Sequence, residues 1–479
     1  MPRCQKDQTD GTGYFLTAPN ILRKVIDHTL QIGRTAARLH LSLNPVTLAF
    51  GDVMRTKSII PMLAGPHFDH IVQRSIQLRH RLHQCPELGY HEKQTSALIA
   101  GELRRLKIPV TTGLAGGTGL TGLITGSGRR CVALRGEMDA LPVQEQTGKA
   151  WASRRPGVMH ACGHDGHTSM VLGAAAWLSR HRSLLPGQVK LLFQPAEEGL
   201  NGALRMCESG ALDRPNVAAV FGLHGWPPMN IGHVATRSGV FLAAVDTFEI
   251  QIRGRGTHAA YPHKGINPIA CGAAIVEALA ADVSREIDPS NTLVLTIATF
   301  NAGTAPNIIP DLSTITGTLR TLTPATRRSA KASMARICKS IGVAHRCQVQ
   351  CRFTSGTPAT VNSAAGADLF ERTAGQILGK KNVSILDKPF LWSEDFAYYL
   401  QRCDGCFFAL GVKPPAIKEY PMLHNPRYDF PDTAMATGIR MLIALAVGYL
   451  AGDTIGINCN PPDPVDSNLP LHVPPQRRT

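Results

Sequence analysis

Apolar residues follow two patterns along this chain, a helical spacing and short continuous runs, and each pattern predicts a different kind of element. Over residues 68–83 and 92–106 they return every three or four positions, which predicts two amphipathic helices. Further along, the almost continuous apolar runs CVALRG, VKLLFQPA and VAAVFGLHG predict buried strands, and HTSMVLGAAAWLSRH between the first two predicts a helix. This alternation predicts an α/β fold, an open sheet with helices on both faces.

The pattern changes near Val234. Residues 235–355 follow the order strand, helix, two strands, helix, strand, which is the order of a ferredoxin-like α+β sandwich. The most apolar later segment, residues 435–452, carries Arg440 and has helical spacing. Because no apolar run reaches the roughly 18 to 20 residues that span a bilayer, this segment is expected to be a buried C-terminal helix.

Both ends of the chain differ from this folded pattern. Residues 453–479 are rich in Pro and Asn and are expected to be disordered. Residues 1–66 contain a helix-like stretch and more basic than acidic residues, which leaves two interpretations open. The segment is either a basic targeting extension, although its aspartates are untypical of one, or a non-native or weakly ordered start upstream of the folded domain.

Composition is typical of a soluble enzyme with two cores: 479 residues, 43% hydrophobic and 18% charged. The 12 cysteines are scattered, which favours the reducing cytoplasm over a disulfide framework, and the pair Cys403 and Cys406 has no second CxxC to complete a zinc site. The net charge of +15 is spread without a basic recognition motif. We therefore expect no nucleic-acid or membrane partner, but a field that attracts carboxylate-bearing substrates.

The run MHACGHDGHT is the strongest chemical signal. It places Cys162, His164 and His167 within six residues, and thiolate and imidazole are the side chains that bind zinc-like ions most tightly. Two carboxylates follow an apolar run at Glu197 and Glu198, so that one could bind metal while the other serves as a base.

Two further histidines lie where metal ligands are often found. His224 ends an apolar run in VAAVFGLHGWPP, and His424 lies in the Pro-bounded stretch YPMLHNPRYDF. Together with Cys162, His164 and Glu198 they give five donors, enough for two ions that share one ligand. Because His424 comes after residues 235–355, we expect that segment to be inserted into a catalytic domain formed by residues 67–234 and 356–452.

In these motifs the chain resembles a known family, the M20 metallopeptidases. Within that family it resembles the amidohydrolase branch of hippurate hydrolases, N-acyl-amino-acid amidohydrolases and auxin-conjugate hydrolases. The resemblance runs from about Phe68 to about Leu450. It rests on these strings, which occur in the family's order: RHRLHQCPELGYHE, LRGEMDALPVQEQTG, MHACGHDGHT, QPAEEG, GLHGWP, GRGTHAAYPHKGINP, NIIPD, SEDFAYY and LHNPRYDF.

The resemblance implies a role for each candidate residue. It implies that Cys162 bridges two divalent ions (Zn, Mn, Co or Ni), that His164, Glu198, His224 and His424 complete the ligand set, and that Glu197 is the general acid/base. Asp139 would orient a ligand from behind. His258, in the inserted segment, would stabilise the substrate oxyanion, and Asn307 and Arg320 would contact the substrate. The family uses the inserted domain as a lid and often for homodimerisation.

The chain departs from the family's pattern at four positions. Glu137 stands where this branch has Asp, Cys85 where it has His, Asn267 where it has Asp, and Trp392 where it has Gly. None of the four is expected to touch a proposed ligand, although Trp392 is expected to alter a loop near the pocket.

These observations predict a metal-dependent amidohydrolase that cleaves an N-acyl amino acid. A dipeptidase, or a deacetylase of diaminopimelate or amino-sugar intermediates, remains an alternative within enzymes. The alternative from another class is a binding protein that keeps the fold without catalysis, but such a protein would be expected to have lost at least one of the five donors or Glu197.

Overall fold

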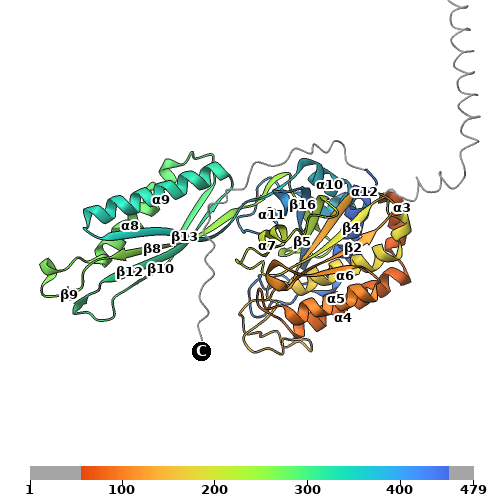
Figure 1. The fold of residues 1–479 in the computed structure, drawn as a ribbon, viewed down its shortest axis with the longest axis horizontal. Coiled ribbons are helices and arrows are strands. Elements are labelled where there is room, and N and C mark those ends of the chain that lie inside the picture. Colours follow the sequence, from red (N-terminus) through yellow and green to blue (C-terminus); the bar gives the residue numbers. More distant parts are fainter. Residues whose placement is uncertain (1–55, 453–479) are drawn as a thin grey trace, which may run out of the picture. The chain divides into compact units, whose positions relative to one another are not determined.

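The computed structural model describes residues 56–452, which form a larger α/β part and an inserted α+β part (Figure 1). The expectations for the N-terminal segment (residues 1–66) and the C-terminal tail (residues 453–479) lie mostly outside this range. Of the N-terminal segment only residues 56–66 are described, and in them Ile59 and Leu63 are buried in the core of the larger part.

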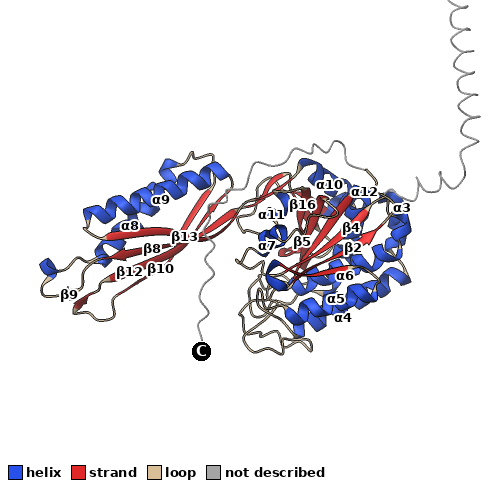
Figure 2. Cartoon of the chain, viewed as in Figure 1, coloured by secondary structure: helices blue, strands red, loops and turns tan. Residues whose placement is uncertain are grey.

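A mixed sheet of eight strands forms the centre of the larger part (Figure 2), and its strand order is β1-β2-β4-β3-β5-β16-β6-β15. The strands are β1 (Val110–Leu114), β2 (Gly119–Thr125), β3 (Cys131–Glu137), β4 (Gln188–Gln194), β5 (Val217–Asn230), β6 (Val234–Thr236), β15 (Val383–Ile385) and β16 (Asp404–Lys413). The central strands β4, β3, β5 and β16 run parallel to one another, so their carboxyl ends lie at one edge. That edge is where open α/β sheets usually place their sites.

Helices cover both faces of this sheet, as predicted. They are α3 (Thr56–Ile59), α4 (Pro66–Gln84), α5 (Lys93–Arg105), α6 (His164–Arg180), α7 (Gly202–Glu208), α10 (Ala364–Leu378), α11 (Ala397–Leu400) and α12 (Met435–Leu450). Alternate residues of β3 point to opposite faces: Leu134 joins the core under α4, α6 and α12, whereas Ala133 joins the core near α7 and α11.

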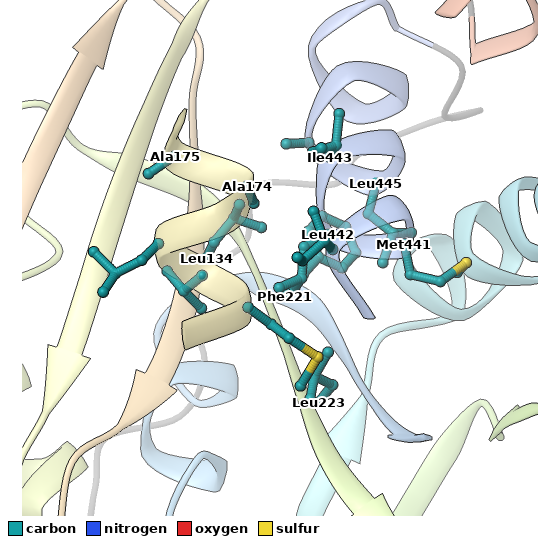
Figure 3. Close-up of a cluster of buried hydrophobic side chains, with 14 of the residues drawn as sticks. Leu134, Ala174, Ala175, Phe221, Leu223, Met441, Leu442, Ile443 and Leu445 are labelled. Atoms are coloured by element: carbon teal, nitrogen blue, oxygen red, sulfur yellow. The ribbon is translucent and has the colours of Figure 1, made fainter. Parts of the chain in front are cut away.

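The helical segment Asp432–Leu450, which includes α12, is long and apolar enough to cross a membrane, but 83% of its most apolar window is buried inside the protein. Figure 3 shows Leu442 and Leu445 of α12 in the same hydrophobic cluster as Phe221 of β5 and Ala174 of α6. The prediction of a buried C-terminal helix is therefore confirmed.

The inserted part is a separate antiparallel sheet with its own core. Strands β8 (Ala244–Arg253), β10 (Leu293–Ala302), β12 (Leu312–Thr321) and β13 (Gln348–Thr357) pair in the order β10-β12-β8-β13. Every second residue of β8 and β12 is buried against α8 (Pro268–Asp282) and α9 (Pro324–Ala344). The strands and helices follow one another in the predicted ferredoxin-like order.

Two short ribbons complete the fold. β7 (Gly239–Leu242) pairs with β14 (Thr360–Asn362), so the chain enters and leaves the inserted part side by side. At another point of the inserted part, β9 (Thr257–His258) pairs with β11 (Ile308–Ile309).

Candidate metal centre

The Cys and His motif lies at the start of α6. The helix begins at His164, three residues earlier than the apolar pattern predicted, and Gly163 before it adopts a φ of +87°. A Cβ atom on Gly163 would meet Phe430 at 2.9 Å, so glycine is required both by conformation and by space. From this first helical turn, His164 and His167 both come close to His224, whereas Asp165 contacts His83 and Arg79 of α4.

Two overlapping groups of donor atoms form at the carboxyl edge of the sheet. Cys162, Glu198 and His424 place one donor atom each within 4.8 Å of one another, and so do His164, Glu197 and Glu198. Glu198 belongs to both groups. Its Oε1 lies 3.3 Å from His424 Nε2.

His224 joins these groups from inside β5 and not from the strand's end, because β5 continues to Asn230. Its Nε2 lies 3.3 Å from Cys162 Sγ. The fold thus brings together, from four segments of the sequence, all the side chains predicted to bind metal and the predicted base: Cys162, His164, Glu197, Glu198, His224 and His424.

Asp139 lies behind this cluster, fully buried just after β3. Its Oδ1 is 3.1 Å from His164 Nδ1, and its Oδ2 accepts a 3.0 Å hydrogen bond from the Glu198 backbone N–H. One carboxylate therefore orients both a ring and the backbone of the next donor, which is the arrangement expected behind a metal site.

The free atoms of the cluster suit a metal ion. With Nδ1 of His164 held by Asp139, its buried Nε2 has no hydrogen-bond partner, and the buried Oε1 of Glu198 has none either. His224 Nδ1 donates to the Gly225 carbonyl at 2.9 Å, which turns its Nε2 lone pair toward Cys162. Buried polar atoms without partners are costly, and metal coordination would satisfy them.

Burial and neighbouring negative charges raise the pKa of two side chains of the cluster. Burial, followed by the charges of Glu394 and Glu198, raises the pKa of Glu197 well above its usual range. Burial and Glu198 do the same to the pKa of the Cys162 thiol, whereas burial and His167 hold the pKa of His224 well below its usual range. A divalent cation would favour the ionised carboxylates and thiolate, and the neutral imidazole is the form that binds metal.

His167 has a different task, although it shares the motif. Its Nε2 accepts the Gly225 backbone N–H at 2.9 Å, so Nδ1 carries the proton and donates to Glu137 at 3.2 Å. Both ring nitrogens are therefore occupied by hydrogen bonds, and His167 fastens α6 to β5 and β3.

Asp165 also faces away from the donors. It lies 2.9 Å from His83 Nδ1 and 3.2 Å from Arg79 Nη1, both on α4. Burial lowers the pKa of His83, but the charge and hydrogen bond of Asp165, together with Glu145, outweigh burial and raise it to about 9. This buried group joins the start of α6 to α4.

Two carboxylates that the sequence analysis did not single out complete the site. Glu394 and Asp395, buried in the SEDF string, share Arg135 of β3 at 2.8 and 3.0 Å. Glu197 lies with these two carboxylates in a third group of close acidic atoms. The SEDF string was the available signal, but nothing in it shows that its acids pair with an arginine some 260 positions earlier.

The expectation that the four departures avoid the proposed ligands is wrong at two of them. Glu137 lies in one compact group with His164, His167 and His224. The ring of Trp392 lies 5.2 Å from the His224 ring and stacks on Trp226 at 5.5 Å. The contacts of Glu137 and Trp392 join segments that are far apart in the sequence, so comparing short sequence motifs one at a time does not reveal them.

None of the three candidate residues of the inserted part belongs to one of the donor groups. His258 in β9 is exposed, and Ala259 beside it donates its backbone N–H to the Asn307 carbonyl at 2.9 Å, so these two candidates are neighbours. Arg320 in β12 donates to the Leu391 carbonyl at 2.8 Å, next to Trp392.

Comparison with known proteins agrees with this site. The model of peptidase family M20/M25/M40 matches residues 133–447. An Arabidopsis thaliana IAA-amino acid hydrolase is 40% identical over 78% of this chain and 85% of its own length, and the hippurate hydrolase of Campylobacter jejuni is 36% identical over 78% and 96%. A Bacillus subtilis M20 peptidase described as dinuclear metal-binding superposes with a TM-score of 0.69 at 30% identity, covering 81% of this chain and 100% of that one.

Proposed function

Because the chain belongs to peptidase family M20/M25/M40, we propose that it is a metal-dependent amidohydrolase that cleaves the amide bond of N-acyl amino acids. Relatives named as an IAA-amino acid hydrolase and a hippurate hydrolase, both covering most of the chain, support this substrate class. The observation that carries the proposal is the convergence of one thiol, three imidazoles and two carboxylates at the carboxyl edge of the sheet.

Two divalent metal ions would be held by five side chains: Cys162, His164, Glu198, His224 and His424. Bound there, the ions supply Lewis-acid chemistry, which polarises a carbonyl and lowers the pKa of water. Cys162 is the candidate bridge, because its Sγ is close both to His224 and to the group of Glu198 and His424. Thiolate and imidazole favour Zn²⁺, while Mn²⁺, Co²⁺ and Ni²⁺ also suit a mixed donor set.

Glu197 is the proposed general acid/base. It sits beside the donors, its side chain is 11% exposed, and its Oε2 lies 4.0 Å from His164 Nε2. In the proposed reaction its carboxylate takes a proton from the attacking water and returns it to the leaving amine. Glu394 and Asp395, both hydrogen-bonded to Arg135, lie beside Glu197, and their negative charges help to raise its pKa.

The inserted part is the proposed lid. His258 would donate to the developing oxyanion, while Asn307 and Arg320 would contact the amide or carboxylate of the substrate. Since His258 and Asn307 are neighbours across β9 and β11, a movement of this ribbon would carry both to the substrate together.

A homodimer through the inserted part belongs to the same proposal. β10 is an edge strand of the four-stranded sheet, and Phe300 on it is 38% exposed. An edge strand with unpaired backbone groups can pair with a second copy. Light scattering on the purified chain tests this, and a monomer at micromolar concentration would contradict it.

The substrate class is tested by incubating metal-loaded protein with hippurate, N-acetyl amino acids, IAA-amino acids and dipeptides, and by measuring the released amine. We expect hydrolysis of at least one N-acyl amino acid, with a turnover that is lower by about 10² to 10⁴ in Glu197→Gln. Cleavage of dipeptides alone would contradict this substrate class and indicate a dipeptidase.

A further inference from the structure

A groove of about 370 Å³ lies between α4, α5 and α6, apart from the metal donors. Its floor is apolar and is formed by Ile71, Leu78, Leu106, Leu172 and Ala176. The helices approach closely here because position 173 is glycine: a Cβ atom would lie 2.6 Å from Ser75 Oγ. The volume is at the lower end of the range for small-molecule sites, about 300 to 1,000 Å³.

The rim of the groove is strongly basic. Arg74, Arg105, Arg180 and Arg182 line it, and Glu102 is the only acidic residue among its lining. Glu102 is already shared by two of the arginines, at 2.8 Å from Arg74 Nη2 and 2.8 Å from Arg105 Nε.

Arg180 and Arg182 are both exposed and make no ion pair with any residue in the range 56–452. The local field is positive as well. Burial, followed by the charges of Arg180, His181 and His70, lowers the pKa of His67 on the same rim. The groove therefore has, beside an apolar floor, two guanidinium groups that form no ion pair within the described residues and can bind an anion.

A simpler explanation is that the arginines only compensate helix dipoles, since α5 ends at Arg105 and α6 at Arg180. Each helix end carries roughly half a negative charge. Two such ends and one carboxylate do not balance four guanidinium groups, so the groove keeps an excess of positive charge. Dipole compensation also gives no reason for an apolar cavity at this place.

We propose that this groove binds a small amphipathic carboxylate, with its hydrocarbon part on the floor and its carboxylate at Arg180 and Arg182. Guanidinium groups recognise carboxylates through paired hydrogen bonds, and an apolar tail gains by leaving water. The groove is distinct from the metal centre, because His164 and Arg180 stand at opposite ends of α6, about 24 Å apart at 1.5 Å per residue.

The test is calorimetric titration of sodium octanoate into the full, metal-loaded chain. Octanamide, which has the same length without the charge, and inorganic phosphate, which has charge without a tail, serve as matched probes. We expect saturable binding of octanoate, and binding at least about tenfold weaker in Arg180→Ala/Arg182→Ala, the loss typical of charged hydrogen bonds. Arg328→Ala, an exposed arginine of α9, should leave the affinity unchanged.

Octanoate can also bind metal ions, so His424→Ala, which alters the metal centre, is the control. This variant should still bind octanoate in the groove with the affinity of the wild type. A second variant, Ala176→Leu, fills the floor and should weaken octanoate binding without removing any charge. Equal affinity in wild type and the double arginine variant would overturn the proposal, as would equally tight binding of phosphate, or loss of binding in His424→Ala alone.

Discussion

At the scale of single residues, Glu197 and Glu198 are neighbours with different partners, which assigns them different tasks. Glu198 contacts His424 and belongs to both donor groups, whereas Glu197 lies toward Glu394 and Asp395. We predict that Glu197→Gln keeps its metal and loses about 10² to 10⁴ in turnover, while Glu198→Gln loses metal. Elemental analysis beside a rate assay separates the two, and exchanged behaviour would reverse the assignment.

Trp392 stands where the family pattern has Gly, and its contacts could not be predicted from that pattern. With Trp226 and Phe390 it forms a group of partly buried rings beside His224. An aromatic acyl group should stack there, a contact worth about 0.5 to 1.5 kcal/mol. In Trp392→Gly we expect the ratio of kcat/KM for hippurate over N-acetylglycine to fall several-fold, and in Trp392→Phe to stay close to wild type. An unchanged or higher ratio in the glycine variant would remove Trp392 from substrate selection.

His83 gives the fold a pH dependence whose sign follows from its pKa of about 9. The folded pKa is above the unfolded value of about 6.5, so this contribution to stability is complete below pH 6.5 and disappears as pH rises through 9. We predict that His83→Gln is less stable than wild type by an amount on the order of 3 kcal/mol near pH 6, and that the difference narrows toward pH 9. Urea unfolding across this range measures it, and a constant difference would contradict it.

At the scale of elements, periodicity predicted most helices and strands, because each depends on a local apolar pattern. Periodicity predicted that α6 begins at His167, because the polar residues His164 and Asp165 do not fit the pattern of a buried helical turn. In the structure both are buried, since Asp165 is paired with His83 and Arg79, and His164 lies close to Glu137. The donor residues were predictable from their strings. The Arg135 network was not, because its partners come from β3 and from the loop before α11.

The ribbon of β9 and β11 carries the predicted oxyanion donor. We expect His258→Ala to lower turnover by about 10² to 10³ with metal content unchanged, the effect of losing one oxyanion donor. Mixing His258→Ala chains with Glu197→Gln chains then tests whether the histidine acts across a dimer. Partial recovery of activity would establish action in trans, and no recovery despite subunit exchange would favour action within one chain. Unaltered turnover in the single variant would exclude His258 from the mechanism.

At the scale of the whole molecule, the chain joins a donor-lined sheet edge to an inserted sheet that carries the substrate-contacting candidates. Arg320 connects the two, because its guanidinium on β12 donates to the Leu391 carbonyl next to Trp392. Ten of the cysteines lie in the described range, and none of the ten forms a disulfide there. The cytoplasmic location itself stays a prediction.

The central claim is that five side chains hold two metal ions and that amide hydrolysis depends on both. Its most direct test is to strip the purified chain with a chelator, return Mn²⁺ or Zn²⁺ stepwise, and follow bound metal together with hydrolysis of the best N-acyl amino acid. We predict that activity is absent without metal and reaches its maximum at two ions per chain, with Cys162→Ser binding at most one and remaining inactive. Full activity with one ion or none, or two ions bound by Cys162→Ser, would contradict the claim.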